Sequence, residues 1–201
     1  DYKHSFCELV WKTVFWKAKF LSSNSHCNQI HLNMRPLQDW FDEYASSHQN
    51  PTNKAIHWIC IPAIFYSLIG LLAAIPSAYF QEFVPHYFIP YAHWGTVLVL
   101  GGLVFYVLHS PSMAVGIALF SIICLTLVNW FSNISMPLWQ SSLIIFAIAW
   151  IGQFYGHKVE GKKPSFFKDV QFLLIGPAWL MGFIYKKLGV KYWNINALKQ
   201  C

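Results

Sequence analysis

One long stretch of the sequence carries almost no charge. Between Lys54 and Lys158, the only Asp, Glu, Lys or Arg is Glu82. A soluble fold with this stretch would expose a largely apolar surface to water, which folded proteins avoid. Of the 201 residues, 56% are hydrophobic and 11% are charged, against about 25% charged residues in soluble domains. The sequence therefore predicts one compact domain embedded in a membrane.

Four apolar runs in this stretch have the length of a membrane-spanning helix, which needs about 20 residues to cross a hydrocarbon layer of about 30 Å. They cover residues 56–80, 91–109, 113–131 and 138–155. Tryptophans lie near the ends of these runs, as in the aromatic belts of membrane interfaces; they are Trp58, Trp94, Trp130 and Trp139. We therefore expect an all-α membrane protein with a bundle of about four transmembrane helices.

An amphipathic helix is expected before the first span. Apolar residues recur there at helical spacing, with acidic residues on the other side; they are Leu37, Trp40, Phe41 and Tyr44. Pro51 disfavours helical geometry at Asn50, so this helix should end near His48. Asn50 is then the predicted N-cap of the first span. We expect this N-terminal helix to lie along the membrane interface.

The C-terminal part contains a fifth apolar run, over residues 170–185. Gly176 and Pro177 interrupt this run, and lysines that favour the cytoplasmic side of a membrane follow it. Both features favour a broken or re-entrant apolar hairpin over a full crossing. Residues 193–201 are expected to form a polar tail.

Residues 1–33 precede the first methionine, Met34, and Glu8 and several lysines break up their apolar residues. The uninterrupted apolar core of a signal peptide is missing from them. We interpret residues 1–33 as an upstream extension and residues 34–192 as a single multi-pass membrane domain. A basic, aromatic helix lying on the membrane surface is the alternative for the first segment.

The net charge of +6 comes from basic segments on either side of the apolar block. This distribution is typical of cytoplasmic segments of membrane proteins, so we exclude nucleic acid as a partner. With four spans, both segments lie on the same side, which is predicted to be the cytoplasmic side of a bacterial inner membrane or the endoplasmic reticulum. The five cysteines form no Cys-x-x-Cys pair, so the sequence indicates neither a disulfide framework nor a zinc ribbon.

The same topology brings distant histidines to one membrane face. His48 and His57 lie near the start of the first span, His157 follows the fourth, and His109 ends the second. Imidazole is the commonest metal ligand and titrates near neutral pH. Glu160 lies three residues after His157 and faces the same way if the fourth helix continues that far. Two histidines and a carboxylate are the ligands of non-haem iron oxygenases.

Polar residues surround three of these histidines; they are Asn50, Asn53 and Gln153. Amide side chains at such positions orient ligand imidazoles through hydrogen bonds, although both asparagines also fit plain helix caps. Lys162 and Lys163 fit either a topogenic signal or a site for an anionic headgroup or carboxylate. From these residues alone, a metal site and a set of interfacial polar caps both stay open, as does a salt bridge between Glu160 and a nearby lysine.

Two motifs stand out in this region. One is Tyr44-x3-His48-x-Asn50-Pro51-x-Asn53-x3-His57-x4-Pro62. The other is Gly156-His157, followed by a glutamate, by Lys-Lys-Pro164 and by Gly176-Pro177. Both resemble the motifs of the small multi-pass 2-hydroxy fatty acid dioxygenases, which include a yeast endoplasmic-reticulum enzyme of phytosphingosine breakdown and bacterial relatives. The resemblance covers residues 35–192.

The resemblance implies an iron(II)-dependent dioxygenase that converts a 2-hydroxy fatty acid and O₂ into an acid one carbon shorter. His48, His57 and His157, with or without Glu160, would hold the Fe(2+) ion. A lysine of the Lys-Lys pair would steady the substrate carboxylate, and the acyl tail would lie between the spans of the lipid bilayer. Two other classes stay open: a non-enzymatic membrane carrier or assembly protein, and a zinc-dependent lipid hydrolase that uses a metal-bound water.

Overall fold

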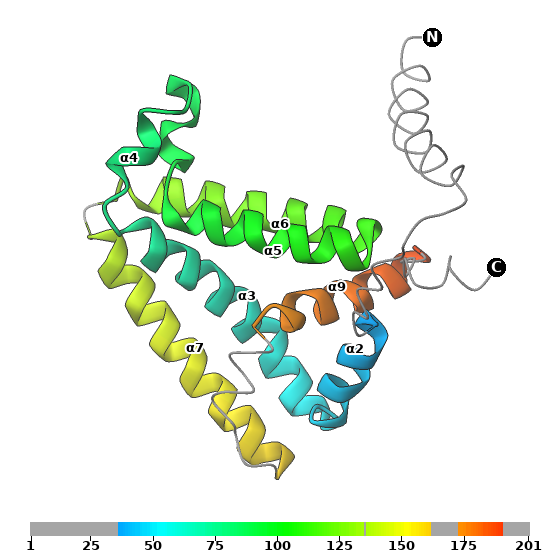
Figure 1. Ribbon diagram of the computed structural model, residues 1–201. Helices are drawn as coiled ribbons and strands as arrows, with labels where there is room; N and C mark the ends of the chain where they lie inside the picture. Colours follow the sequence, from blue (N-terminus) through cyan, green and yellow to red (C-terminus); the bar gives the residue numbers. More distant parts are fainter. Residues whose placement is uncertain (1–35, 135, 162–172, 191–201) are drawn as a thin grey trace, which may run out of the picture. The chain divides into compact units, whose positions relative to one another are not determined.

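A computed structural model of the 201-residue chain describes residues 36–134, 136–161 and 173–190. They all belong to Arg35–Cys201, one of the two compact units into which the chain divides. The expected extension over residues 1–33 and the expected tail over residues 193–201 lie outside the described residues. The described elements are all helices (Figure 1). In chain order they are α2 (Leu37–Ser46), α3 (Pro51–Ala73), α4 (Ala78–Gln81), the 3-10 helix η1 (His86–Tyr91), α5 (Trp94–His109), α6 (Pro111–Phe131), α7 (Leu138–Glu160) and α9 (Ile175–Leu188).

Three of these helices, α3, α6 and α7, are long and apolar enough to cross a membrane. The apolar helix α5 has 16 residues and rises about 24 Å, somewhat less than a hydrocarbon layer of about 30 Å. Large apolar side chains cover the outer surface of these helices; Leu100, Leu119 and Ile148 are 58%, 59% and 64% exposed. Lipid accepts such a surface and water does not, so the protein is an all-α integral membrane protein, as predicted.

The junction between α2 and α3 matches the prediction. α2 ends at Ser46, just before His48, and α3 begins at Pro51. The Asn50 side chain accepts a hydrogen bond from the Thr52 N–H (2.8 Å) and caps α3 as expected. Proline is favoured in the first turn of a helix because the N–H groups there have no acceptor within the helix, so the absence of an N–H costs no hydrogen bond. This short junction fixes the position of His48 relative to α3.

Two predicted boundaries are wrong. The first span was expected to end at residue 80, but α3 ends at Ala73, because Pro76 disfavours helical geometry at Ile75. The fourth span was expected to end at residue 155, but α7 continues to Glu160 and stops at Gly161, whose φ of 73° is left-handed. The extra turn of α7 carries His157 on a regular helix.

α3 and α7 pack against each other more extensively than any other pair of elements. They run in opposite directions (Figure 1), so the start of α3 and the end of α7 meet at the same end of the pair. Gly152 and Gly156, four residues apart on α7, lie against α3. A Cβ at Gly152 would come within 2.6 Å of the Cys60 sulfur, and one at Gly156 would collide with the Asn53 side chain. Small residues at this spacing allow two membrane helices to approach closely.

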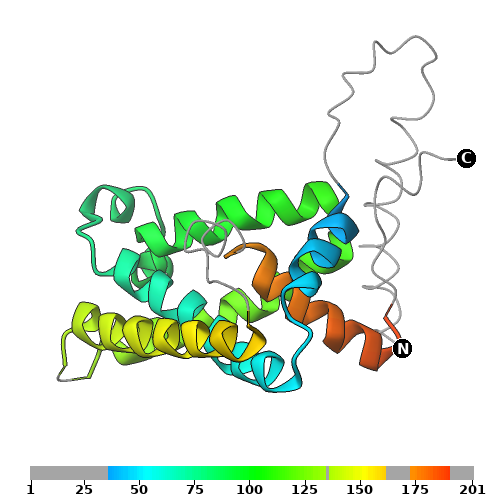
Figure 2. The same ribbon diagram turned by 90° about the horizontal axis from the view of Figure 1, so that it is seen from below.

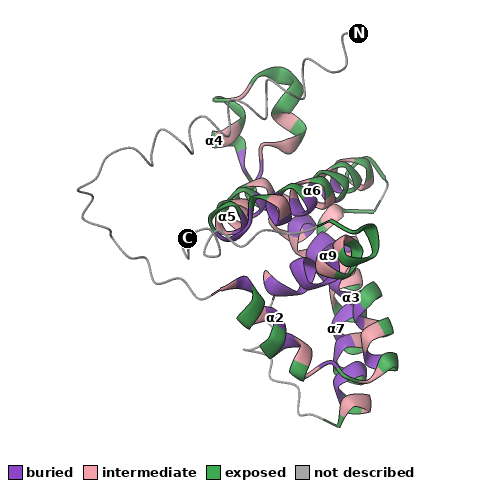
Figure 3. Cartoon of the chain, turned by 90° about the vertical axis from the view of Figure 1, so that its right-hand side faces the viewer, coloured by how far each residue is buried: buried purple, intermediate pink, exposed green. Residues whose placement is uncertain are grey.

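α9 packs beside α2 (Figure 2). Its first half is buried and its last turns are exposed, as the purple and green segments of Figure 3 show. The buried residues of both helices form one apolar cluster with neighbouring residues of α3, α5 and α6; among them are Leu37, Phe41, Tyr44, Ala178, Trp179 and Leu180. This packing brings the Trp179 ring next to His48, on which the Tyr44 ring of α2 already stacks.

The described part of the expected C-terminal hairpin is a single helix. Gly176 and Pro177 occupy the first turn of α9, where proline is tolerated because the N–H groups have no helical acceptor. They therefore precede the body of the helix and do not interrupt it. With 14 residues, α9 rises about 21 Å, too short for a full crossing. The part of the run before residue 173 lies outside the described residues.

Candidate metal centre

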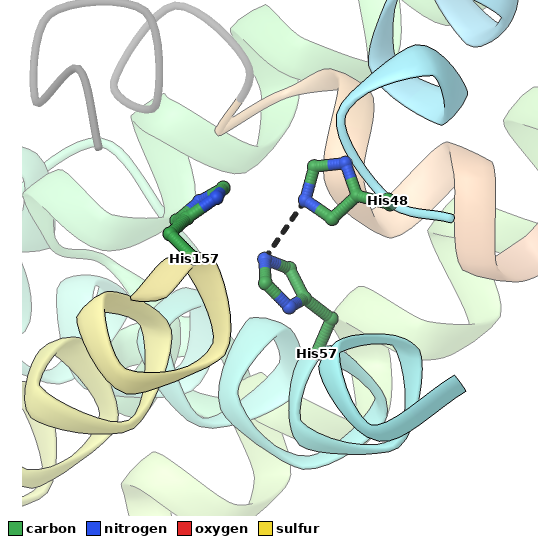
Figure 4. A group of neighbouring side chains, drawn as sticks. All are labelled: His48, His57 and His157. Carbon is green, nitrogen blue, oxygen red and sulfur yellow. Dashed lines mark hydrogen bonds between the residues drawn. The ribbon is translucent and has the colours of Figure 1, made fainter. Parts of the chain in front are cut away.

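Three histidines from different parts of the chain come together where α3 and α7 meet. His48 lies in the α2–α3 junction, His57 in the second turn of α3 and His157 in the last turn of α7. All three are buried, with exposed fractions of 2% for His48, 1% for His57 and 5% for His157. One ring nitrogen of each lies within 4.8 Å of those of the other two, and the three rings converge on a common space (Figure 4).

Two of the rings are fixed by backbone carbonyls four residues earlier. His48 Nδ1 lies 2.6 Å from the Tyr44 carbonyl oxygen, and His57 Nδ1 lies 2.9 Å from the Asn53 carbonyl oxygen. A carbonyl oxygen only accepts hydrogen bonds, so each Nδ1 carries the proton and donates it. In the neutral rings, the lone pair is therefore on Nε2. Hydrogen bonds of this kind orient metal-bound histidines in many proteins.

The Nε2 atoms of His48 and His57 face each other at 2.9 Å (dashed line in Figure 4). If both rings are neutral, two lone pairs point at each other, which is repulsive unless a cation lies between them. A proton on one ring would satisfy this pair alone. A metal ion would satisfy it and would also engage the third ring, His157, whose centroid lies 5.3 Å from that of His48 and 5.2 Å from that of His57.

The donor set fits a divalent transition metal. Metal–nitrogen bonds are about 2.0–2.1 Å long, so two nitrogens on one ion lie at most about 4.2 Å apart. The facing Nε2 pair at 2.9 Å already meets this limit, and all three ligand nitrogens lie within 4.8 Å of one another. Three neutral imidazoles leave coordination positions open for small ligands, which is the arrangement of catalytic metal sites.

Aromatic rings close one side of this cluster. The Tyr44 ring stacks on His48, with centroids 4.0 Å apart and an interplanar angle of 13°. Trp179 of α9 contacts the same tyrosine edge-on at 5.1 Å and lies 5.7 Å from the His48 ring. Tyr44 was predicted on the apolar face of the helix before the first span and begins the first of the two motifs, whereas no role was predicted for Trp179. Tyr44 reaches His48 from the end of α2, four residues earlier in the chain, whereas Trp179 is brought to the site by the packing of α9 beside α2.

Glu160 is not among the residues whose ligand atoms gather in this cluster. Its carboxylate instead accepts hydrogen bonds from the backbone N–H groups of Gln49 (2.7 Å) and Asn50 (2.9 Å) and from the Asn53 side-chain amide (3.0 Å). Charge-assisted bonds of this kind are stronger than neutral ones. Glu160 therefore links the end of α7 to the α2–α3 junction that carries His48. The alternative of a salt bridge with Lys162 or Lys163 involves residues outside the described part of the chain.

The amide residues serve in other ways than predicted. Asn50 caps α3, and the Asn53 side chain donates to Glu160 while its backbone carbonyl holds His57. Side-chain amides were expected to orient the imidazoles, but for His48 and His57 backbone carbonyls do so. The Asn53 Oδ1 atom is buried and has no hydrogen-bond partner among the described residues.

Gln153 lies one turn before His157 on α7 and is 8% exposed. Its Oε1 atom is buried and, within the described part of the chain, accepts no hydrogen bond. Gln153 and His57 line a small cavity of about 30 Å³, enough for a water-sized group. An unsatisfied acceptor beside a histidine cluster costs free energy unless a ligand or water donates to it. This residue therefore points to a donor group that binds next to the histidines.

His109, which was expected on the same membrane face, is not part of the three-histidine group. Its Nδ1 donates to the Phe105 carbonyl oxygen (2.8 Å). Lys162 and Lys163 lie outside the described residues, so their expected contact with a substrate carboxylate stays a prediction.

Fold and site together define an all-helical membrane protein with a buried three-histidine candidate metal centre. Residues 34–188 match the family described as 2-hydroxy-palmitic acid dioxygenase Mpo1-like, so the chain belongs to this family, as the motifs indicated. The chain is 27% identical over 148 residues to 2-hydroxy-palmitic acid dioxygenase MPO1 of Saccharomyces cerevisiae. This matching region covers 73% of this chain and 78% of the yeast protein. No solved structure matches the chain.

Proposed function

We propose that this protein is an iron(II)-dependent dioxygenase that shortens 2-hydroxy fatty acids by one carbon. Family membership supports the type of activity, since the yeast relative is named as a 2-hydroxy-palmitic acid dioxygenase. The observation that carries the proposal is the facing pair of Nε2 atoms of His48 and His57, 2.9 Å apart and buried. With His157 beside them, this pair provides neutral nitrogen ligands of the kind that suit iron.

In this proposal, His48, His57 and His157 hold the ion, and the ion supplies a site at which O₂ is activated. The protein's own groups prepare this site. The carbonyl oxygens of Tyr44 and Asn53 keep both Nδ1 atoms protonated and both Nε2 atoms available as ligands. Glu160 holds the junction that carries His48, because its carboxylate accepts hydrogen bonds from the backbone N–H groups of Gln49 and Asn50.

The substrate's polar head is proposed to bind beside His57. Gln153 Oε1 is positioned to accept a hydrogen bond from the 2-hydroxyl group, because it is a buried acceptor at the edge of the small cavity. Lys162 or Lys163 would neutralise the carboxylate, as the sequence analysis suggested. The Tyr44 and Trp179 rings exclude water from one side of the cluster. These contacts would place the bond between the first two carbons next to the ion.

A second candidate is a zinc-dependent lipid hydrolase. It is favoured by one observation: the described cluster contains three histidines and no carboxylate, and three histidines are a known ligand set of catalytic zinc. Such an enzyme would use a metal-bound water and would need no O₂. Metal content and oxygen dependence together separate this candidate from the dioxygenase.

The experiment uses the full chain, purified in detergent and reconstituted anaerobically with Fe(II). We expect 2-hydroxypalmitate to disappear only when O₂ is admitted, with a fatty acid one carbon shorter, CO₂ and water as the products, which balances one O₂ per substrate. Removal of iron with a chelator should abolish this conversion, and restoring Fe(II) but not Zn(II) should recover it. Conversion that persists without iron, or that needs no O₂, would contradict the proposal.

A further inference from the structure

A second, much larger cavity lies among α3, α5 and α6. It has a volume of about 460 Å³, within the range of about 300–1,000 Å³ for pockets that bind small molecules. Residues of α3, α5 and α6 and the two residues before α9 line it; among them are Leu98, Gly102, Tyr106, Ser121, Leu173 and Leu174. The mechanism proposed above does not use this cavity.

The large cavity adjoins the histidine site through one side chain. Leu173 lines the large cavity and also lines the small cavity next to His57 and Gln153. A molecule whose polar head lies beside His57 would therefore have the large cavity next to it, on the side of Leu173. One elongated ligand could therefore place its polar end in the small cavity and its other end in the large cavity.

The lining of the large cavity suits a hydrocarbon chain and not a polar head group. Only two of its side chains carry a hydroxyl. The Tyr106 hydroxyl is occupied, since it donates to the Leu174 carbonyl oxygen. The Ser121 hydroxyl is buried without a partner among the described residues, and a single hydroxyl does not compensate the burial of a carboxylate. A charged group would therefore be costly here, whereas burial of an apolar chain is favourable.

We propose that this cavity holds the acyl tail of the 2-hydroxy fatty acid and that Gly102 sets the length of tail accepted. The inference rests on the proposed function for the identity of the head group, but the fit of the tail is argued from the cavity alone. Gly101, on the rim, is exposed, and a Cβ there would meet nothing within 4 Å. In a bilayer this rim faces lipid, so the tail enters from the membrane and not from water.

Gly102 is suited to this role by its position on α5. Leu98, Gly102 and Tyr106 are four residues apart and share the helix face that lines the cavity. A Cβ at Gly102 would meet only the side chain of Leu174, at 3.4 Å. A larger side chain here would extend into the cavity and would take up space that the tail otherwise occupies. Leu100, two positions away, is 58% exposed and lies on the other face.

The test compares variants that change the cavity in opposite directions. Gly102→Leu should lower kcat/KM for the longest 2-hydroxy acids at least about tenfold and leave the shortest ones unchanged, since each methylene excluded from an apolar site changes affinity about fourfold. Leu98→Ala should shift the preference toward longer chains. Leu100→Ala removes the same side chain from the outer face of α5 and should change neither profile. Gly102→Ala provides a milder version in case the leucine disturbs folding.

A binding measurement without turnover separates this inference from the proposed function. Metal-free protein is titrated with saturated fatty acids of graded length, which displace a fluorescent fatty acid. A chain-length shift in Gly102→Leu or Gly102→Ala would support the tail cavity even if the protein proves not to be a dioxygenase. Unchanged chain-length profiles in all cavity variants would overturn it. The inference would also be overturned if mass spectrometry showed a co-purified phospholipid and added fatty acids did not bind to the wild-type protein.

Discussion

The histidine cluster and the apolar cavity are neighbouring regions built by opposite means. In the cluster, polar atoms are fixed by short contacts, such as the 2.6 Å bond from His48 to the Tyr44 carbonyl oxygen. In the cavity, apolar side chains of α3, α5 and α6 surround open space. Small changes should therefore abolish function at the cluster, whereas changes in the cavity should shift selectivity in graded steps. The following predictions test this contrast, beginning with the largest expected effect.

Removal of one cluster histidine should have the largest effect. In His57→Ala, we expect bound metal to fall below about a tenth of the wild-type content and activity to fall at least about 100-fold, since even outer-shell changes cost about 10- to 100-fold. Metal analysis and turnover of 2-hydroxypalmitate measure both. His109→Ala is the matched control, because that ring is also buried and also bonds to a carbonyl four residues earlier. Equal metal loss in both variants would contradict a specific site.

Gly156→Ala should damage the site with every histidine still present. The added Cβ would collide with the Asn53 side chain and lie 3.4 Å from the His57 ring, so α7 would have to move away from α3. We expect metal affinity to fall about 10- to 100-fold and stability to fall by about 1–3 kcal/mol. Metal titration and thermal unfolding measure the two effects. Gly101→Ala, at a helical glycine with open space around it, should leave metal affinity unchanged and raise stability by about 0.5–1 kcal/mol.

Glu160→Gln tests whether this residue positions the junction or binds the metal. An uncharged amide keeps the shape of the side chain but weakens the bonds to the Gln49 and Asn50 N–H groups. We expect about a tenfold loss of metal affinity while the number of metal-bound nitrogens, observed by X-ray absorption, stays the same. A change in the oxygen ligands of the metal would instead identify Glu160 as a direct ligand. Glu82→Gln, at an exposed position, is the control.

Gln153→Leu should have the smallest effect, on selectivity. Loss of the Oε1 acceptor removes one hydrogen bond to the 2-hydroxyl group, which is worth about 0.5–1.5 kcal/mol, or up to about tenfold in affinity. We expect the preference for a 2-hydroxy acid over the unsubstituted acid to decrease by that factor, with unchanged binding of the unsubstituted acid. Gln140→Leu, near the other end of α7, should change neither. An unchanged preference in Gln153→Leu would exclude this role.

Most of the fold was predictable because membrane-spanning helices can be recognised in a sequence as long apolar runs. The apolar runs located α3, α5, α6 and α7, and the proline after Asn50 located the start of α3. The end of α3 was missed because the apolar run continues past Pro76 and hides the break. The start of α9 was missed for the opposite reason: Gly176 and Pro177 look like an interruption but occupy a first turn.

The site was predictable only in part. Topology predicted that His48, His57 and His157 share a membrane face, and the structure brings them into one cluster; their role as ligands stays a prediction. The bond between Glu160 and the junction joins residues 110 and 111 positions apart, and no local pattern indicates it. The same holds for Trp179, which reaches His48 only because α9 packs beside α2.

The most direct test of the account is the metal content of the protein purified from cells and again after anaerobic reconstitution with Fe(II). It is measured for the full chain and for His48→Ala, His57→Ala and His157→Ala, with folding checked by circular dichroism. We expect close to one iron per wild-type chain and loss of that iron in all three variants while the helices persist. A folded wild-type protein that binds no metal even after reconstitution would contradict it, because the three histidines would then be buried polar groups without the proposed ion.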